Sequence, residues 1–229
     1  MSNILIAGDS WGCGEWLDAK IHGRNILAHK GIEQFLKDVG HDVVNASKTG
    51  ESNKVVTDRL IDALSKKQFD YIFWIQTDPL RNLRPNYFHP LSTLRTVEDF
   101  NQLGNKLLEP IYDKLNSLST PIYCIGGLGK LNLELMKDRQ NLIPLIPCVV
   151  ELIIENYQRY PLAFSDWLDD IPKDFEEFDE LIRLKHEYDK WFTDEPFKTF
   201  FYPDGVHPNR KGHEKIFEYI QDNVLTKKL

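Results

Sequence analysis

Three residues at the two ends of this sequence carry the side chains needed for nucleophilic catalysis: Ser10, Asp204 and His207. A serine hydroxyl attacks a carbonyl carbon when a neighbouring base takes its proton, and histidine suits that role because its pKa lies near neutrality. A carboxylate bonded to the other ring nitrogen fixes the tautomer of the histidine. Asp204 precedes His207 by three residues, with Gly205 and Pro208 forming a turn, so its carboxylate can fold onto the ring. The order Ser, Asp, His is compatible with a catalytic triad.

Each of these three residues also has an ordinary structural interpretation. Ser10 ends a Gly-Asp-Ser run and can cap a turn or a helix, as serine often does. Asp204 is a common turn former, and His207 can be a surface turn residue. The residue types alone therefore do not establish a catalytic site, and the elements that bring the two ends of the chain together must decide.

Acyl transfer also requires hydrogen-bond donors aimed at the oxygen on which negative charge develops. Gly50 has no side chain, so its N–H can approach a substrate closely; the alternative is a turn glycine that needs a positive φ. Thr77 can donate through its hydroxyl, or it is an ordinary threonine at a strand end. Asn53 can aim its amide at the site, or it caps the helix that begins there.

Strands and helices are expected to alternate along most of the chain. Apolar runs predict five strands, at 3–7, 42–46, 71–75, 121–125 and 142–150, and helical periodicity predicts helices at 29–39, 53–66, 98–118 and 210–224, with an irregular loop at 11–28. Repeated strand-then-helix units predict an α/β fold with a central parallel sheet of about five strands and helices on both faces. In such sheets ligands bind at the carboxyl ends of the strands. Ser10, Gly50 and Thr77 each follow a predicted strand, so they are expected to meet at this edge.

Residues 151–202 interrupt the alternation, because aromatic and acidic residues are interleaved there and two helices are expected, near 148–159 and 173–192. One interpretation is a helical annex whose aromatic side chains fill its own core. The other is a cap over the carboxyl edge of the sheet that lends aromatic side chains to a substrate pocket. The sequence leaves both open, and we expect residues 1–229 to form one domain that includes this insertion.

The composition argues against several other classes of protein. The net charge of −7 argues against a nucleic-acid partner. The apolar run at the N-terminus is too short for a signal peptide or a membrane span, and three cysteines at Cys13, Cys124 and Cys148 suggest neither a disulfide framework nor a metal site. The histidines show no zinc spacing, and the glycines near Ser10 fit no nucleotide-binding motif. We therefore expect a soluble cytoplasmic protein without metal, membrane or nucleic-acid partners.

Three blocks of the sequence resemble those of the SGNH/GDSL hydrolase family. Gly8-Asp9-Ser10 resembles the first block, 43–47 leading to Gly50 resembles the second, and 204–209 closely resembles the last. The blocks occur in the family's order and span nearly the whole chain. The resemblance implies a flavodoxin-like three-layer α/β/α sandwich with the helical insertion before the last block, hydrolysis of ester or acyl bonds, and no cofactor.

The same resemblance implies roles for individual residues. Ser10 is the expected nucleophile, His207 the base and then the acid, and Asp204 its orienter, while the backbone amides of Ser10 and Gly50 serve the oxyanion. The third block departs from the family pattern Gly-x-Asn-Asp, because Thr77 stands where the asparagine is expected. A threonine hydroxyl is shorter than an amide, so Asn53 is the candidate substitute for the third donor.

These expectations define three functional hypotheses. The first is a serine esterase that cleaves a small acyl group, such as acetyl on a carbohydrate, through an acyl-enzyme intermediate. The preference for a carbohydrate ester rests on polar loops and on aromatic residues that can stack on sugars. The second is a catalytically weak binding or structural module on the same fold, and the third is an unrelated flavodoxin-like binder in which Ser10 and His207 never meet. The oligomeric state is open.

Overall fold

The central element of the computed structural model is a parallel sheet of five strands. The structure describes residues 1–16, 26–83, 94–127, 129–154, 175–176, 179, 183, 195–201 and 207–226. The strands are β1 (Asn3–Ala7), β4 (Asp42–Asn45), β5 (Tyr71–Gln76), β6 (Ile122–Gly126) and β7 (Leu142–Ile146), and they lie in the order β4-β1-β5-β6-β7. This is the flavodoxin-like order, in which the connections reverse direction at β1 and β5. The predicted fold class is confirmed.

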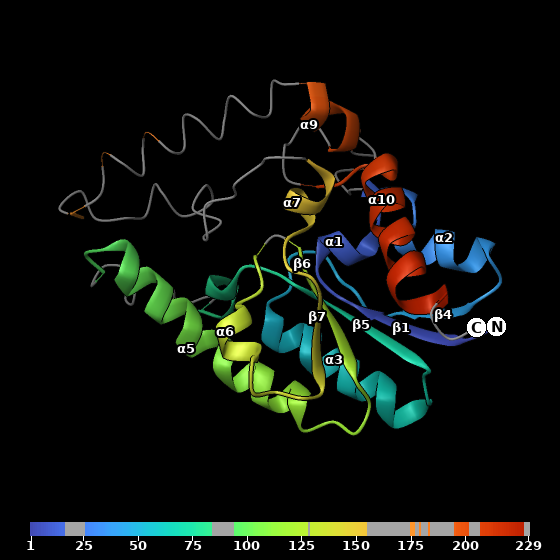
Figure 1. The fold of residues 1–229 in the computed structure, drawn as a ribbon, viewed down its shortest axis with the longest axis horizontal. Helices are drawn as coiled ribbons and strands as arrows, with labels where there is room; N and C mark the ends of the chain where they lie inside the picture. The colour runs from blue at the N-terminus through green and yellow to red at the C-terminus, as the bar shows by residue number, and fades with distance from the viewer. Residues whose placement is uncertain are drawn as a thin grey trace.

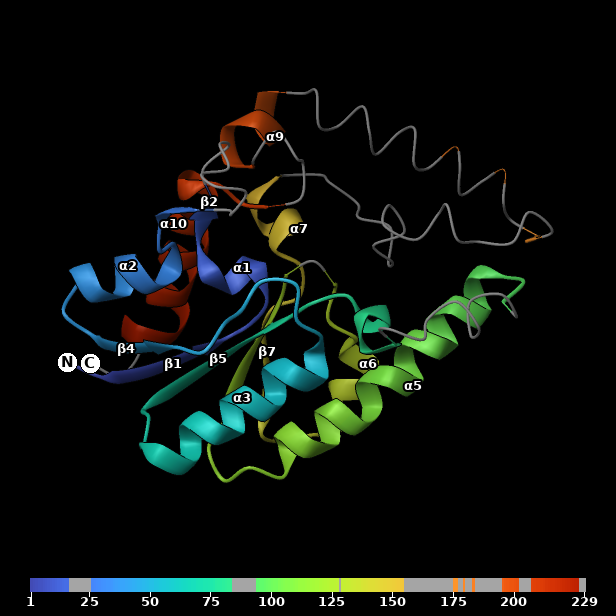
Figure 2. The same ribbon diagram turned by 180° about the vertical axis from the view of Figure 1, so that it is seen from behind.

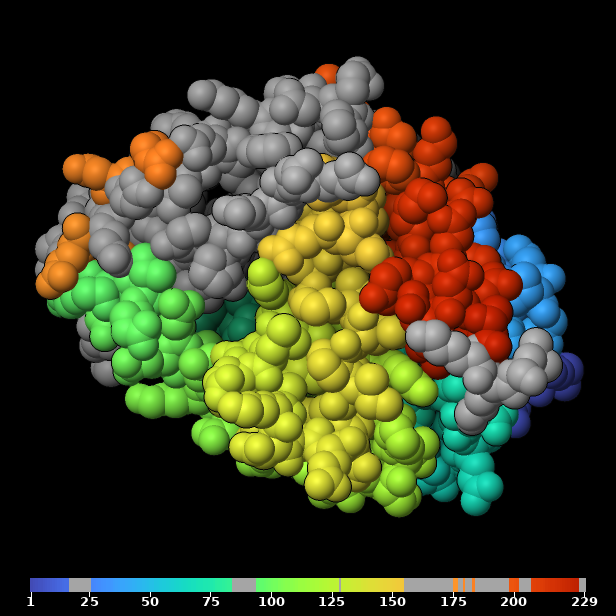
Figure 3. Space-filling model, viewed as in Figure 1, coloured from blue at the N-terminus to red at the C-terminus, as the bar shows by residue number. Residues whose placement is uncertain are grey.

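Helices cover both faces of the sheet (Figures 1 and 2). One face carries α2 (Ile32–Asp38), α7 (Val149–Ile153) and α10 (Arg210–Ile220), of which α7 and α10 lie side by side on the surface in Figure 3. The other face carries α3 (Asn53–Lys66), α5 (Val97–Asn116) and α6 (Leu133–Met136). Side chains of a strand point alternately to its two faces. Accordingly Ile4 and Ile6 of β1 pack in the core beneath α2 and α10, while Leu5 packs in the core beneath α3 and α5.

The strongest strand of the sequence lies at the centre of the sheet. All six residues of β5 are buried, and β5 pairs with β1 on one side and β6 on the other. This burial is what a continuously apolar run predicts for a strand covered on both faces. Helix α3 has the predicted bounds and is capped by Ser52, whose Oγ accepts from the N–H of Val55.

The prediction of an irregular loop at 11–28 is wrong for the residues that the structure describes there. Ser10–Cys13 form the short helix α1, and β2 (Glu15–Trp16) pairs with β3 (Leu27–His29) in an antiparallel ribbon. Elements this short contain too few residues for a hydrophobic period to show. The helix predicted at 29–39 is shorter, because α2 begins at Ile32 after Gly31, whose φ is +54°.

Most of the predicted insertion at 151–202 lies outside the described residues. The helix expected near 148–159 corresponds to α7 in its described part, and α9 (Glu195–Phe200) lies near the end of the segment. The helix expected near 173–192 falls almost entirely outside the description, so both interpretations of this segment stay open. The final helix, predicted at 210–224, is α10 followed by a π-helical turn, η4 (Gln221–Leu225).

Candidate active site

Ser10 and His207 meet although they lie at opposite ends of the chain. The Ser10 Oγ and the His207 Nε2 are 2.8 Å apart, which is a hydrogen-bonding distance. Ser10 is the first residue of α1, directly after β1, so it lies at the carboxyl edge where the connections reverse. Asp204, the expected third member, lies outside the described residues. The arrangement gives a buried hydroxyl a base within reach of its proton.

The turn that presents Ser10 is held by its own aspartate. Asp9 is the N-cap of α1, and its Oδ1 accepts from the N–H of Trp11 at 3.0 Å. Gly12 lies so close to Ser47 that a Cβ on the glycine would overlap the serine hydroxyl. The missing side chain therefore lets α1 pack directly against the chain that follows β4.

His207 is held by contacts on both sides of it in the sequence. Pro208 forms an antiparallel bridge with Phe201, whose ring packs edge-on against Trp11 with centroids 6.1 Å apart. Asn209 caps α10 by accepting from the N–H of Gly212. These contacts join the start of α10 to α1, and so they hold His207 beside Ser10.

An ion pair adds a second link between the same two elements. The Arg210 guanidinium contacts the Glu15 carboxylate at 3.1 Å, and the Arg210 backbone N–H donates to the same carboxylate at 3.2 Å. Glu15 follows α1 and Arg210 begins α10. The pair is partly exposed, so its contribution to stability is small.

A buried charge network lies directly behind Ser10. The Asp9 carboxylate is 0% exposed, and its Oδ2 accepts from the Thr77 hydroxyl at 2.6 Å and from the Arg81 guanidinium at 2.8 Å. Arg81 belongs to η1 (Pro79–Leu83), the 3₁₀ turn after β5. Sequence reasoning did not identify Arg81 or the partners of Asp9, because the contact spans 72 residues and no motif marks it. The network links the end of β5 to the residue that precedes Ser10.

Two of the expected oxyanion donors are paired with each other. The Asn53 Nδ2 donates to the Thr77 carbonyl oxygen and the Thr77 N–H donates to the Asn53 Oδ1, both at 2.9 Å. The Thr77 hydroxyl donates its only hydrogen bond to the Asp9 carboxylate. An amide group has a second N–H and a hydroxyl does not. In this arrangement Asn53 therefore retains a donor, while Thr77 has none left in its side chain.

Gly50 lies in an exposed turn after β4 with a φ of +74°. The Lys48 N–H donates to the Gly8 carbonyl oxygen at 3.0 Å, which ties this turn to the turn that carries Ser10. Glycine adopts such a φ without strain, so the turn itself favours glycine at position 50.

Burial governs two further ionisable groups near the site. It raises the pKa of the Cys13 thiol to about 11, and the negative charge of Asp9 adds to this effect. Because the thiolate is the reactive form, Cys13 stays unreactive at neutral pH although it lies one turn from Ser10. Burial lowers the pKa of His213, which is 0% exposed in α10, to about 4. His213 is therefore neutral at pH 7.

The described part of the chain offers no evident metal centre or membrane span. Its residues include no group of three or more His, Cys, Asp or Glu side chains arranged to hold a metal ion. Among the same residues, no helix combines the length and the apolarity needed to cross a membrane.

Comparison with known proteins identifies similar chains. The model of the family described as GDSL-like lipase/acylhydrolase matches residues 4–220. Among solved structures, the psychrotrophic esterase EstA from Pseudoalteromonas sp. is 14% identical, with a TM-score of 0.46 and coverage of 99% of this chain and 98% of that one. A carbohydrate acetylesterase family member from Sinorhizobium meliloti is 12% identical, with a TM-score of 0.46 and coverage of 99% and 98%.

An acetyl xylan esterase from Geobacillus stearothermophilus is 13% identical, with a TM-score of 0.49 and coverage of 96% of this chain and 93% of that one. A comparison with curated protein sequences gives no match.

Proposed function

This chain belongs to the GDSL-like lipase/acylhydrolase family and is an SGNH-type esterase, and from that premise we propose that Ser10, His207 and Asp204 hydrolyse a small acyl ester of a carbohydrate. The observation that carries the assignment is the 2.8 Å separation between the Ser10 Oγ and the His207 Nε2. A neutral His207 with its proton on Nδ1 accepts the serine proton at Nε2.

The reaction proceeds in two halves. As Ser10 Oγ bonds to the ester carbonyl carbon, its proton moves to His207 Nε2. The tetrahedral intermediate collapses when the bond to the alcohol oxygen breaks, and His207 returns the proton to that oxygen. Water then attacks the acyl-enzyme with His207 again as the base, which releases the acid and restores the Ser10 hydroxyl.

Asp204 is proposed as the group that orients His207. The support is its position three residues before the histidine, within a segment whose flanks, Phe201 and Pro208, are bridged. A carboxylate on Nδ1 keeps the proton there and stabilises the imidazolium that forms. Replacing Asp204 by Asn should lower kcat by roughly 10⁴-fold with little change in KM, because the wrong tautomer is then favoured.

The oxyanion is proposed to be held by the backbone N–H groups of Ser10 and Gly50 and by the amide of Asn53. Asn53 is favoured over Thr77 because its amide retains an N–H beyond the one given to the Thr77 carbonyl. The Thr77 hydroxyl is committed to Asp9 at 2.6 Å. Loss of one such donor typically lowers kcat by about 10²–10³.

A fluorophosphonate probe tests the nucleophile. We expect the probe to label the wild-type protein and not Ser10→Ala, and we expect p-nitrophenyl acetate hydrolysis to be lost in the same variant. Ser47→Ala is a matched control, because it removes a buried hydroxyl beside α1 that has no hydrogen-bond partner among the described residues. The control should retain both labelling and hydrolysis. A folded wild-type protein that the probe does not label would refute the triad and favour a binding module.

A further inference from the structure

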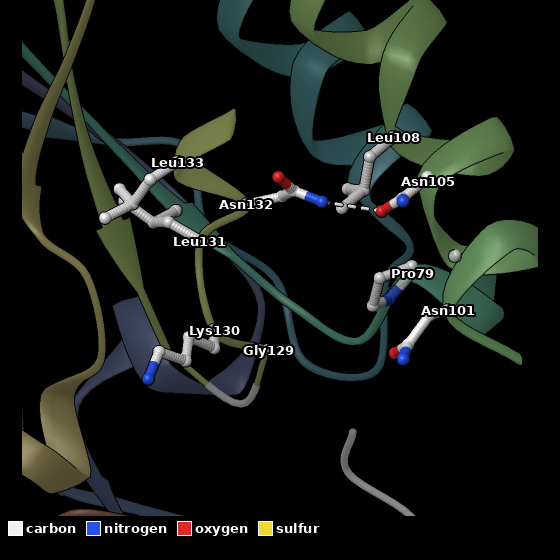
Figure 4. Close-up of a pocket in the computed structure, with 10 residues that line it drawn as sticks. Pro79, Asn101, Asn105, Leu108, Gly129, Lys130, Leu131, Asn132 and Leu133 are labelled. Carbon is white, nitrogen blue, oxygen red and sulfur yellow. Dashed lines mark hydrogen bonds between the residues drawn. The ribbon is translucent and has the colours of Figure 1, made fainter. Parts of the chain in front are cut away.

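A cavity of about 260 Å³ lies between α5 and the chain that follows β6 (Figure 4). Asn101 and Asn105 border it from α5, and Asn132 borders it from the opposite wall. Gly104 and Leu108 complete the α5 wall, so the four α5 residues follow the spacing of one helix face. The cavity is therefore bordered by three amide side chains and by an apolar patch that includes Leu108.

Some hydrogen-bonding groups of these three asparagine side chains have no partner among the described residues. Asn132 donates to the Asn105 Oδ1 at 2.6 Å and accepts from the N–H of Leu135 at 3.0 Å. Among the described residues, the Asn105 amino group and the whole Asn101 amide have no partner. An amide group can both donate and accept, so these side chains match hydroxyl groups, which do the same.

The wall opposite α5 is fixed by a buried chain of hydrogen bonds. The Tyr112 hydroxyl donates to the Gln76 Oε1 at 2.6 Å and accepts from the backbone N–H of Asn132 at 3.3 Å. The Gln76 Nε2 donates to the Lys130 carbonyl oxygen at 2.7 Å. Gln76 is the last residue of β5, so the sheet itself holds this wall in place, and a ligand meets preorganised groups.

Gly104 is the residue that keeps the α5 wall open. Glycine is the poorest helix former after proline, and Gly104 lies inside a helix of 20 residues. A Cβ at this position would meet Pro79 atoms at 3.9 Å, which is an ordinary contact. Neither a clash nor a positive φ requires glycine here, and its effect is to leave space in the cavity.

The cavity adjoins the elements that hold Ser10. A Cβ on Gly129, which borders the cavity, would lie 2.7 Å from the Thr77 carbonyl oxygen. Thr77 in turn contacts Asp9, the residue before Ser10. The volume lies below the range of about 300–1,000 Å³ usual for drug-sized ligands, so one ring-sized group fits better than an extended chain.

The charge around the cavity favours a neutral ligand. Lys130 is the one charged residue that borders it in the described part of the chain, and its Nζ pairs with Glu151 at 2.8 Å. An alkyl chain would leave the amides without water or a partner, which is unfavourable. A pyranose ring presents hydroxyls to amides and C–H groups to an apolar patch such as Leu108.

We infer that this cavity binds the sugar ring of the substrate alcohol, an inference that rests on the proposed esterase function and assigns Asn101, Asn105 and Gly104 to specificity. The ring makes the same contacts before and during the reaction. Loss of a contact should therefore raise KM for a sugar ester and leave kcat unchanged.

Binding is tested first on Ser10→Ala, which does not depend on turnover. We expect saturation-transfer NMR to detect methyl β-glucopyranoside and to detect little cyclohexanol, which has the ring without the hydroxyls. Adding Asn101→Leu should weaken the signal, and adding Gly104→Leu, which fills the cavity, should abolish it. Gln102→Leu removes an amide from an exposed position of the same helix and should leave the signal unchanged. Absent pyranoside binding, equal cyclohexanol binding, or a pyranoside signal that neither cavity variant reduces would overturn the inference.

Kinetics separate this inference from the proposed function. With an acetylated methyl glucopyranoside, Asn101→Leu should raise KM about 2- to 10-fold, the effect of one neutral hydrogen bond. With p-nitrophenyl acetate, which has no sugar, the same variant should match the wild type. Unchanged KM for the sugar ester, with normal p-nitrophenyl acetate hydrolysis, would refute the subsite and leave the esterase assignment intact. If the fluorophosphonate probe does not label the folded wild-type protein, the proposed function itself is refuted.

Discussion

The buried pair between Arg81 and Asp9 provides a sharp test of how Ser10 is held. Asp9 is 0% exposed, and the Arg81 side chain is 11% exposed with its Nη1 2.8 Å from the carboxylate. Arg81→Met leaves a buried carboxylate with two neutral donors, the Thr77 hydroxyl and the Trp11 N–H. Removing one partner of a buried ion pair typically costs about 3–5 kcal/mol, because the other charge is left uncompensated. We expect a loss of that size in the free energy of unfolding, measured with urea at pH 7.

Arg139→Met is the matched control. The Arg139 side chain is 15% exposed, much like Arg81, but its partner Asp113 is 63% exposed, so water solvates the carboxylate that remains. We expect its ion pair to contribute under about 1 kcal/mol. The double variant Asp9→Asn, Arg81→Met should recover part of the stability lost in Arg81→Met, because no charge remains buried.

The hydrogen bonds between Asp9, Thr77 and Arg81 should also affect esterase activity, because they set the position of Ser10. Asp9 caps the turn that begins with Ser10, and a displacement of about 1 Å can lower a rate by 10²-fold. Arg81→Lys keeps the charge without the planar fork, so it should fold and show a lower kcat for p-nitrophenyl acetate at an unchanged KM. The reasoning is refuted if Arg81→Met costs no more stability than Arg139→Met, or if Arg81→Lys retains the full kcat.

Three further predictions concern single residues. Burial lowers the pKa of His213 from 6.5 to about 4. Between these two pH values His213 is protonated in the unfolded chain but stays neutral in the folded chain, so its contribution to the free energy of unfolding should fall by about 3 kcal/mol from pH 7 to pH 4. Urea unfolding should show that His213→Leu lacks this loss, and an equal loss in both proteins would contradict the burial argument. Gly50→Ala and Gly40→Ala both place alanine at a positive φ, +74° and +93°, with open space around the new Cβ, so each should cost about 1–2 kcal/mol by thermal or urea unfolding. Only Gly50→Ala should also lower kcat, and a kcat loss of the same size in Gly40→Ala would argue against the Gly50 N–H as an oxyanion donor. Asn53→Ala should lower kcat for p-nitrophenyl acetate well beyond Thr77→Ala, whereas equal or reversed losses would contradict Asn53 as the third donor.

The layout of the sheet could be predicted because it is encoded in long, uninterrupted patterns. The apolar run of β5 predicts a strand buried on both faces, and the periodicity of α3 predicts its bounds. Helix α1 escaped prediction because four residues cannot show a helical period. Asp9 is the N-cap of α1, but it also belongs to the Gly-Asp-Ser block, so the sequence alone does not distinguish a cap from a motif residue.

The site was predictable where chemistry restricts the residue type and not where geometry alone decides. That Ser10 and His207 would meet could be expected, because few side chains can serve as nucleophile and base. Arg81 was not found, because an arginine near a proline turn is ordinary and its partner is 72 residues away. The cavity beside α5 was also missed, since it depends on how that helix packs against the chain after β6.

The departure of Thr77 from the family pattern has a physical explanation in its contacts. Its hydroxyl reaches Asp9 at 2.6 Å, and its backbone is paired at both the N–H and the carbonyl oxygen with the Asn53 amide. Thr77 therefore anchors the end of β5 to Asp9 and to α3 through its short side chain. An asparagine that turned its amide toward a substrate would leave Asp9 with one hydrogen bond fewer. We propose a division of roles in which Thr77 and Arg81 hold Asp9 beside Ser10, while Asn53 keeps a spare N–H for the proposed oxyanion site.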